Sequence, residues 1–187
     1  MTGSVVRAWG VGHSVAPTAI SLLALGAVAS FAATTLIPGL GARLPIPVWA
    51  LVPPMLAILS SLGVVNSLPE LSPPTAALVI ARAGWLTAVL LVGAASAGLV
   101  TVAAGFHGLV EATVLLIALT YAAAALVGRG SVVVGGALVV YVVTNTQTYA
   151  DLSGQEGLLY AGAAWHWAGG VVALVGCLGF VWRGGNR

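Results

Sequence analysis

Residues 83–127 read AGWLTAVLLVGAASAGLVTVAAGFHGLVEATVLLIALTYAAAALV, and Glu111 is the only residue among them that carries a formal charge. A short break at Gly105–Gly108 divides the run, and glycines at such a spacing are typical of a tight turn. The two halves, 83–104 and 109–127, each approach the ~20 apolar residues that a helix needs to cross a bilayer. This stretch therefore predicts two transmembrane helices joined by a tight turn.

The rest of the chain has the same apolar character. Sixty per cent of its residues are hydrophobic and 5% are charged, whereas a soluble domain has about 25% charged residues. A chain so poor in charge has little surface to offer to water. We therefore expect an all-α, polytopic membrane protein that forms a single transmembrane domain. The six expected spans lie near 16–37, 46–67, 83–104, 109–127, 131–149 and 164–182.

The positions of the basic residues predict the orientation of these spans. There is no lysine, and the six basic residues are Arg7, Arg43, Arg82, Arg129, Arg183 and Arg187. If the N-terminus lies in the cytoplasm, Arg43 is the single arginine that faces outward. Arginines in short loops gather on the cytoplasmic side, so both termini are expected there, in the plasma membrane.

Residues 1–15 precede the first span and are too short and too broken by glycine to cross a bilayer. Arg7 can face head groups while Trp9 faces lipid, which suits a short interfacial helix on the cytoplasmic leaflet. A frayed tail is the alternative. No cleaved signal peptide is expected, because the first span is too long for its apolar region.

Two sequence features bear on how the spans pack. Adjacent prolines at 53 and 54 fall inside the second span and predict a kink or a local unwinding of that helix. Small residues four apart allow helix backbones to approach closely. Three such pairs are Gly26 with Ser30, Ala94 with Gly98, and Gly169 with Ala173.

Most ionisable groups other than arginine fall on the expected outer side. This outer polar cluster comprises His107, Glu111, Asp151, Glu156 and His166. His107 and Glu111 are four apart and share a face if their helix begins early enough, which would suit a metal or a proton relay. A glutamate one turn inside a span more often pairs with an arginine, here Arg43. Because no repeated ligand motif is present, no metal is expected.

The end of the fifth span is a polar run. Its candidate pathway-lining residues are Thr144, Asn145, Gln147 and Thr148. Unsatisfied polar groups are costly in lipid, so these side chains either line the mouth of a pathway or already lie among head groups.

Several chemistries find no support in the sequence. There is no GxxxxGK[ST] loop for nucleotide phosphates and no GxSxG nucleophile motif. The absence of lysine excludes a retinal Schiff base, and the isolated histidines do not pair for haem. Basic clusters with interleaved aromatics are absent, so no nucleic acid partner is expected. We expect a protein that is not an enzyme and that uses no cofactor.

The layout resembles the permease subunits of type-2 ABC exporters. That family has six spans with both ends inside, an interfacial N-terminal helix, and an inner coupling helix between spans two and three. Here residues 1–15 correspond to the first helix and the cytoplasmic loop 68–82 to the second, while the outer loop 150–163 corresponds to the family's exit helices.

The resemblance implies a set of partners and a mechanism. A separate ATP-binding cassette ATPase would contact Pro69, Glu70, Leu71 and Arg82. A homodimer or a second permease would complete the path, within the membrane lipids. ATP-driven closure of the ATPase would then shift the two bundles as rigid bodies and move a lipid, a peptide or a hydrophobic natural product.

Two other classes fit the same layout. The first is the substrate-capture subunit of an energy-coupling vitamin importer, which would bind a small vitamin in an outer pocket. The second is a non-catalytic accessory subunit of a larger membrane complex. Tight binding of a vitamin by the chain alone would favour the first, and recovery with a redox or synthase complex would favour the second.

Overall fold

The computed structural model is all-α apart from one pair of two-residue strands. It describes residues 14–37, 46–65, 75–106, 108–137, 140 and 163–183. The α-helices are α2 (Val15–Phe31), α3 (Val48–Val65), α4 (Ala76–Ala104), α5 (Leu109–Val127) and α8 (Ala163–Arg183). A 3₁₀ turn, η1 (Gly128–Gly130), follows α5, and residues 131–137 are again helical. The strands are β1 (Leu36–Ile37) and β2 (Ile46–Pro47).

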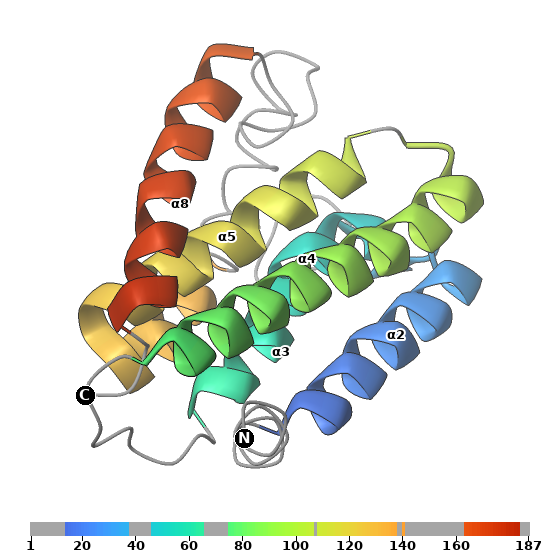
Figure 1. The fold of residues 1–187 in the computed structure, drawn as a ribbon. Helices are drawn as coiled ribbons and strands as arrows, with labels where there is room; N and C mark the ends of the chain where they lie inside the picture. Colours follow the sequence, from blue (N-terminus) through green and yellow to red (C-terminus); the bar gives the residue numbers. More distant parts are fainter. Residues whose placement is uncertain are drawn as a thin grey trace.

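The described helices pack side by side, and along the chain from α2 to α5 they alternate in direction (Figure 1). The ring of Trp49, at the start of α3, stacks on Phe106, just after α4, with centroids 4.4 Å apart. Near the other end of the same helix, the hydroxyl of Tyr121 in α5 donates to the carbonyl of Ser60 at 3.0 Å. Helices α3, α5 and α8 therefore run in one direction, while α2 and α4 run in the opposite direction.

This alternation gives the bundle two distinct ends. One end, which we call the arginine end, holds Arg82 near the start of α4, the position of Arg129 within η1, and Arg183 at the close of α8. The opposite end, which we call the Glu111 end, holds that carboxylate in the first turn of α5. The described basic residues thus lie together, away from the described acidic residue.

The outer surface of the bundle is rich in large apolar side chains. Phe31 is 92% exposed, Val102 87% and Leu126 84%. The buried set includes hydroxyl-bearing residues such as Thr113 and Ser96, both fully buried. Among the described helices, α4 and α5 are long and apolar enough to cross a membrane, and three further apolar helices are shorter.

Small residues bring the helix backbones together at two crossings. A Cβ built on Gly26 of α2 would lie 2.6 Å from the Cβ of Ser96 in α4. A Cβ built on Gly176 of α8 would lie 2.6 Å from the Cα of Ala122 in α5. Neither crossing has room for a methyl group. The prediction of close packing is confirmed for Gly26, whereas Gly98 faces open space.

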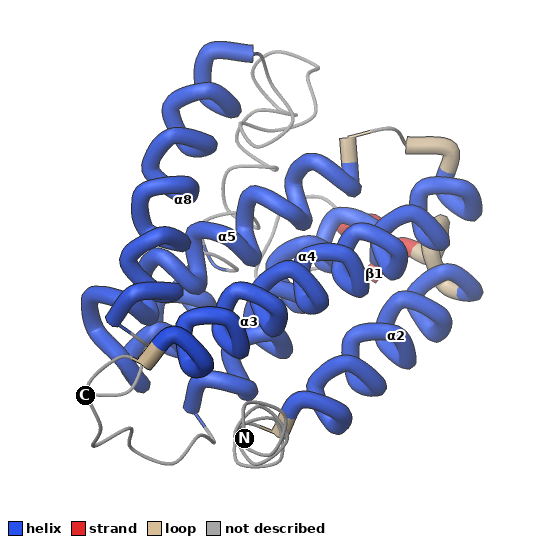
Figure 2. Tube along the Cα trace, in the orientation of Figure 1, coloured by secondary structure: helices blue, strands red, loops and turns tan. Residues whose placement is uncertain are grey.

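The helix bounds differ from the sequence expectation at two places. Helix α5 has the bounds predicted for the span 109–127, but α4 begins at Ala76, so residues 76–82 of the predicted loop are helical. The hydroxyl of Thr75 caps this start by accepting from the amide of Leu78 at 3.3 Å. Helix α2 ends early, at Phe31, because the chain turns and then forms the β1–β2 pair (Figure 2).

Helix α3 passes through both prolines without a break. Pro53 and Pro54 are buried, and residues 48–65 remain helical throughout. Of the two predicted outcomes, the local unwinding is therefore not seen, and the kink stays a prediction. Each proline removes one intrahelical hydrogen-bond donor. The turns on either side nevertheless stay helical, because both prolines are buried against neighbouring helices.

Candidate functional site

An open groove of about 860 Å³ lies between α4, α5 and α8. Its wall on α4 includes Ala83, Leu86, Thr87 and Leu90; its wall on α5 includes Val110, Glu111, Val114, Leu115 and Ala118. Its wall on α8 includes Trp167, Gly170, Ala173, Leu174, Cys177, Leu178 and Val181. The surface is therefore almost entirely aliphatic, and the groove runs along most of α8.

The contact of α8 with α5 includes two close approaches at glycines of α8. Gly169 packs against Leu115, and Gly176 packs against Ala122. Gly170, which directly follows Gly169 in the sequence, faces away from α5, since a Cβ built there meets no atom within 4 Å. Helix α8 thus packs against α5 and leaves an open space on the side that faces α4.

Polar groups in the groove are few, and most bond to their own surroundings. The hydroxyl of Thr87 donates to the carbonyl of Ala83 at 2.9 Å. The thiol of Cys177 lies 3.6 Å from the carbonyl oxygen of Ala118, a weak hydrogen bond. Glu111 is therefore the one charged side chain among the residues that line the groove.

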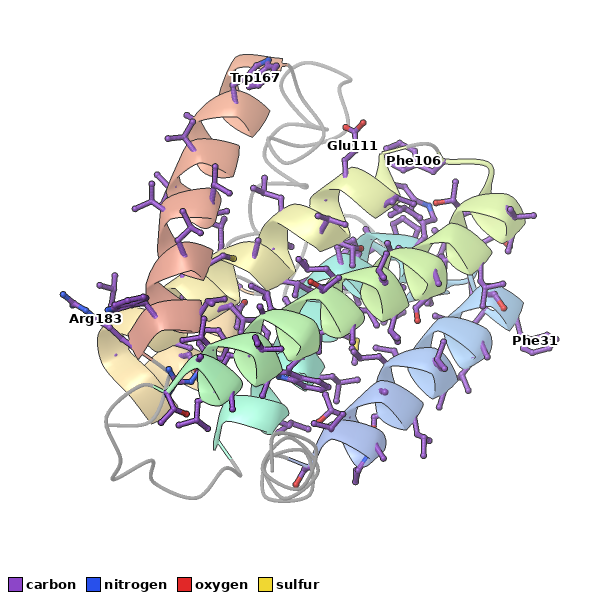
Figure 3. All side chains as sticks on the ribbon, in the orientation of Figure 1. Phe31, Phe106, Glu111, Trp167 and Arg183 are labelled. Carbon is purple, nitrogen blue, oxygen red and sulfur yellow. The ribbon has the colours of Figure 1, made fainter. Side chains whose placement is uncertain are left out.

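Glu111 and Trp167 lie at the same end of the groove on different walls (Figure 3). Glu111 occupies the first turn of α5, where the helix dipole favours a negative charge. Trp167 lies near the start of α8 and its side chain is 77% exposed. The lining at the Glu111 end of the groove therefore includes a carboxylate on α5 and an aromatic side chain on α8.

Arg82 lies at the opposite end of the bundle, next to the lining residue Ala83 in the sequence. Its side chain is 2% exposed, and its Nη1 donates to the carbonyl oxygens of Val181 at 3.3 Å and Trp182 at 3.0 Å. The last carbonyls of a helix have no intrahelical donors, and a cation there also suits the helix dipole. Arg82 therefore acts as a cap for the C-terminus of α8.

A buried aromatic cluster lies near this end of the bundle. The rings of Tyr121 and Phe180 meet edge to face at 4.9 Å, while Trp85 is 4% exposed on α4. The buried indole nitrogen of Trp85 lies beside the hydroxyl of Tyr121. The cluster joins α3, α4, α5 and α8 around one point.

The structure describes few of the site residues that the sequence predicts. Twelve lie outside the described residues: Arg7, Trp9, Pro69, Glu70, Leu71, His107, Thr144, Asn145, Gln147, Thr148, Asp151 and Glu156. So does Arg43, the expected partner of Glu111. For His166 the structure places the backbone in the first turn of α8, at the Glu111 end, and not the side chain.

Arg82 has a contact within the chain that the sequence did not predict. Its buried side chain bonds to the end of α8, while the contact with an ATPase that the resemblance implies stays a prediction. The physical reason is that α4 begins at Ala76, which draws Arg82 into the bundle. Its sequence position beside an apolar run did not reveal this burial.

The groove itself was not anticipated from the sequence. The closest signal is the small-residue pair Gly169 and Ala173, which marks the contact side of α8 but not the open side. Within the described part of the chain, no group of three or more His, Cys, Asp or Glu side chains could hold a metal ion.

Comparison of the chain with protein-family models, with curated proteins and with solved structures finds no match. The function is therefore argued from the geometry of the bundle and its groove.

Proposed function

We propose that this chain is a multi-pass protein of the plasma membrane with six spans and with its arginine end in the cytoplasm. The exposed apolar side chains on α2, α4 and α8 support this, because soluble monomers rarely expose apolar patches of this extent. The grouping of the described arginines at one end supports the orientation.

The directions of the helices support the number of spans. Helix α5 ends at the arginine end and α8 begins at the Glu111 end. The chain between them must therefore pass from one end of the bundle to the other, as the predicted span 131–149 would. Helices α3 and α4 meet at the arginine end, so the chain between residues 65 and 76 begins and ends on the cytoplasmic side.

Within that class, we propose a permease subunit of an ABC exporter that moves an amphipathic, hydrophobic cargo. The observation that carries the proposal is the apolar groove between α4, α5 and α8, with a carboxylate at one end. The chain has no phosphate-binding loop, so ATP would be hydrolysed by a separate subunit. Pro69, Glu70 and Leu71, in the connection between α3 and α4, are the proposed contacts with that subunit.

The contacts of α8 suggest how the motion would reach the groove. Arg82 joins the first turns of α4 to the last carbonyls of α8. A push on the connection before α4 would therefore move the end of α8 as well. A small rigid-body rotation of α8 against α5 would then change the width of the groove.

The orientation is tested with single cysteines in a Cys177→Ala background. Ala103→Cys lies at the Glu111 end of α4 and Ala76→Cys at its arginine end, and both positions are exposed. A membrane-impermeant maleimide should label Ala103→Cys in intact cells and Ala76→Cys after permeabilisation. The reverse pattern would overturn the orientation.

The partner is tested by co-purification of the full chain in mild detergent. An ATPase should be recovered, and Leu71→Ala should lower its yield while Leu99→Ala, on the exposed face of α4, should not. Recovery with a redox or synthase complex would instead support an accessory subunit. Tight binding of a small vitamin by the chain alone would support a capture subunit.

A further inference from the structure

We propose that α8 carries an apolar band too short for an ordinary bilayer, and that the lipid leaflet beside α8 is thinned at the Glu111 end. The inference rests on the proposed membrane placement, and it does not depend on an ATPase partner. It concerns the lipid that borders the groove, because α8 forms one of the groove walls.

The apolar band of α8 is the run of sixteen residues 167–182, which lies between His166 and Arg183 and contains no charged residue. Trp167 and Trp182, at its two ends, are both exposed, and tryptophan is typical of the membrane–water interface. Three exposed valines between them lie outside the groove lining: Val171, Val172 and Val175. The band therefore presents an apolar face to its surroundings, with an aromatic anchor at each end.

The arginine end of the band suits a phospholipid head group. Arg183 follows Trp182 directly, and its side chain is exposed. A guanidinium pairs well with a phosphate because its donors match the geometry of the phosphate oxygens. This charge complementarity supports lipid as the partner of the exposed face of α8.

The band is shorter than the hydrocarbon core of a bilayer. Sixteen helical residues rise about 24 Å, whereas the core is ~30 Å thick. The neighbouring helix α4 carries twenty-two uncharged residues from Ala83 to Ala104, a rise of about 33 Å. Figure 1 shows α8 inclined to α4, which shortens the reach of α8 along the axis of α4 further.

The contact of Arg82 with α8 places this shortfall at one end of the bundle. The Nη1 of Arg82 donates to the carbonyl of Trp182 at 3.0 Å, so the apolar runs of α4 and α8 start level at the arginine end. The band of α8 therefore ends at Trp167, below the level of Ala104. Residues 163–166 hold no long charged side chain that could snorkel. Because a short span is then accommodated by thinning of the bilayer, the thinned leaflet lies at the Glu111 end.

The depth of each helix is measured with spin labels on single cysteines in a Cys177→Ala background, in dioleoyl phosphatidylcholine nanodiscs. Ala168→Cys on α8 and Leu99→Cys on α4 are compared, because both positions are exposed. They lie about 21 Å and about 24 Å from the arginine end of their apolar runs. In a flat bilayer Ala168 is the deeper position, so its label would have less access to an aqueous nickel chelate. The thinned leaflet predicts the reverse, with higher access at Ala168.

A second measurement follows thermal unfolding in nanodiscs of two chain lengths, dioleoyl and the shorter dimyristoleoyl phosphatidylcholine. His166→Leu makes residues 163–182 continuously apolar, about 30 Å of helix. It should raise the unfolding midpoint by about 5 °C in the longer lipid and should give no such gain in the shorter one. Val175→Leu adds apolar volume without lengthening the band, so its effect should be the same in both lipids.

Equal or lower nickel access at Ala168 than at Leu99 would overturn the proposal. So would an effect of His166→Leu that is equal in the two lipids. A disulfide-linked dimer formed through Val175→Cys would also overturn it, since a second copy would then cover α8. A failure of the proposed membrane orientation would appear in the cysteine labelling of Ala103 and Ala76 instead, independently of these results.

Discussion

The guanidinium of Arg82 donates to the carbonyl oxygen of Trp182 at 3.0 Å, across one hundred residues of sequence. The same nitrogen reaches the carbonyl of Val181 at 3.3 Å. The contact fixes the start of α4 to the end of α8, which also packs on α5 through Gly176 and Phe180. Because Ala83 and Val181 line the groove, this contact joins two of its walls at the arginine end.

Replacement of Arg82 by methionine should destabilise the protein. The substitution keeps much of the aliphatic stem but leaves the two terminal carbonyls of α8 without their donor. The expected loss is about 1–3 kcal/mol of unfolding free energy, measured by denaturant titration in detergent micelles with tryptophan fluorescence.

The matched control for this substitution is Arg183→Met. Arg183 is the last residue of α8 and its side chain is exposed. A surface substitution of this kind usually changes stability by less than about 0.5 kcal/mol. Equal unfolding midpoints for the two variants would refute the capping role of Arg82.

Thr75→Ala should weaken the first turns of α4. The hydroxyl of Thr75 accepts from the amide of Leu78, and the loss of such a cap costs about 1 kcal/mol. Hydrogen exchange of the amides in residues 76–82 should accelerate about fivefold. Thr87→Ala is the control, because its hydroxyl bonds back to a carbonyl inside the helix. Unchanged exchange in Thr75→Ala would mean that the cap does not hold this turn.

Tyr121→Phe should separate the hydrogen bond of this residue from its packing. The variant loses the bond to the carbonyl of Ser60 but retains the edge-to-face contact with Phe180. The expected cost is about 1 kcal/mol, whereas Tyr121→Ala should cost about 3–5 kcal/mol because the side chain is fully buried. Similar losses for both variants in the same denaturant titration would contradict this division.

The sequence predicts α5 well because its ends carry clear signals. Glycines at 108 and 128 bound a continuous apolar run, and the helix occupies the residues between them. It predicts the start of α4 poorly. Prolines at 73 and 74 and the charge of Arg82 suggested a loop, whereas the threonine directly after the prolines marks the cap.

The groove could not be predicted because it depends on which small residue meets which helix. Gly169 and Gly170 are adjacent, yet the first contacts Leu115 and the second faces open space. Because both residues are glycines, the sequence does not show which of them contacts α5 and which faces the groove. Likewise, the burial of Arg82 follows from its contact with residues one hundred positions away, and a single sequence carries no signal for such a pair.

The crossing of α8 over α5 gives the sharpest test of the packing. A Cβ on Gly176 would meet the backbone of Ala122, whereas a Cβ on Gly170 meets no atom within 4 Å. Gly176→Ala should therefore force the helices apart and cost about 1–3 kcal/mol. Gly170→Ala should be neutral or should stabilise α8 by up to about 1 kcal/mol, since alanine favours the helix over glycine. Thermal unfolding of both variants in the same detergent measures the difference. Because the two positions lie on one helix, an equal effect in both would place α8 elsewhere than against Ala122, and the groove would then lack its third wall.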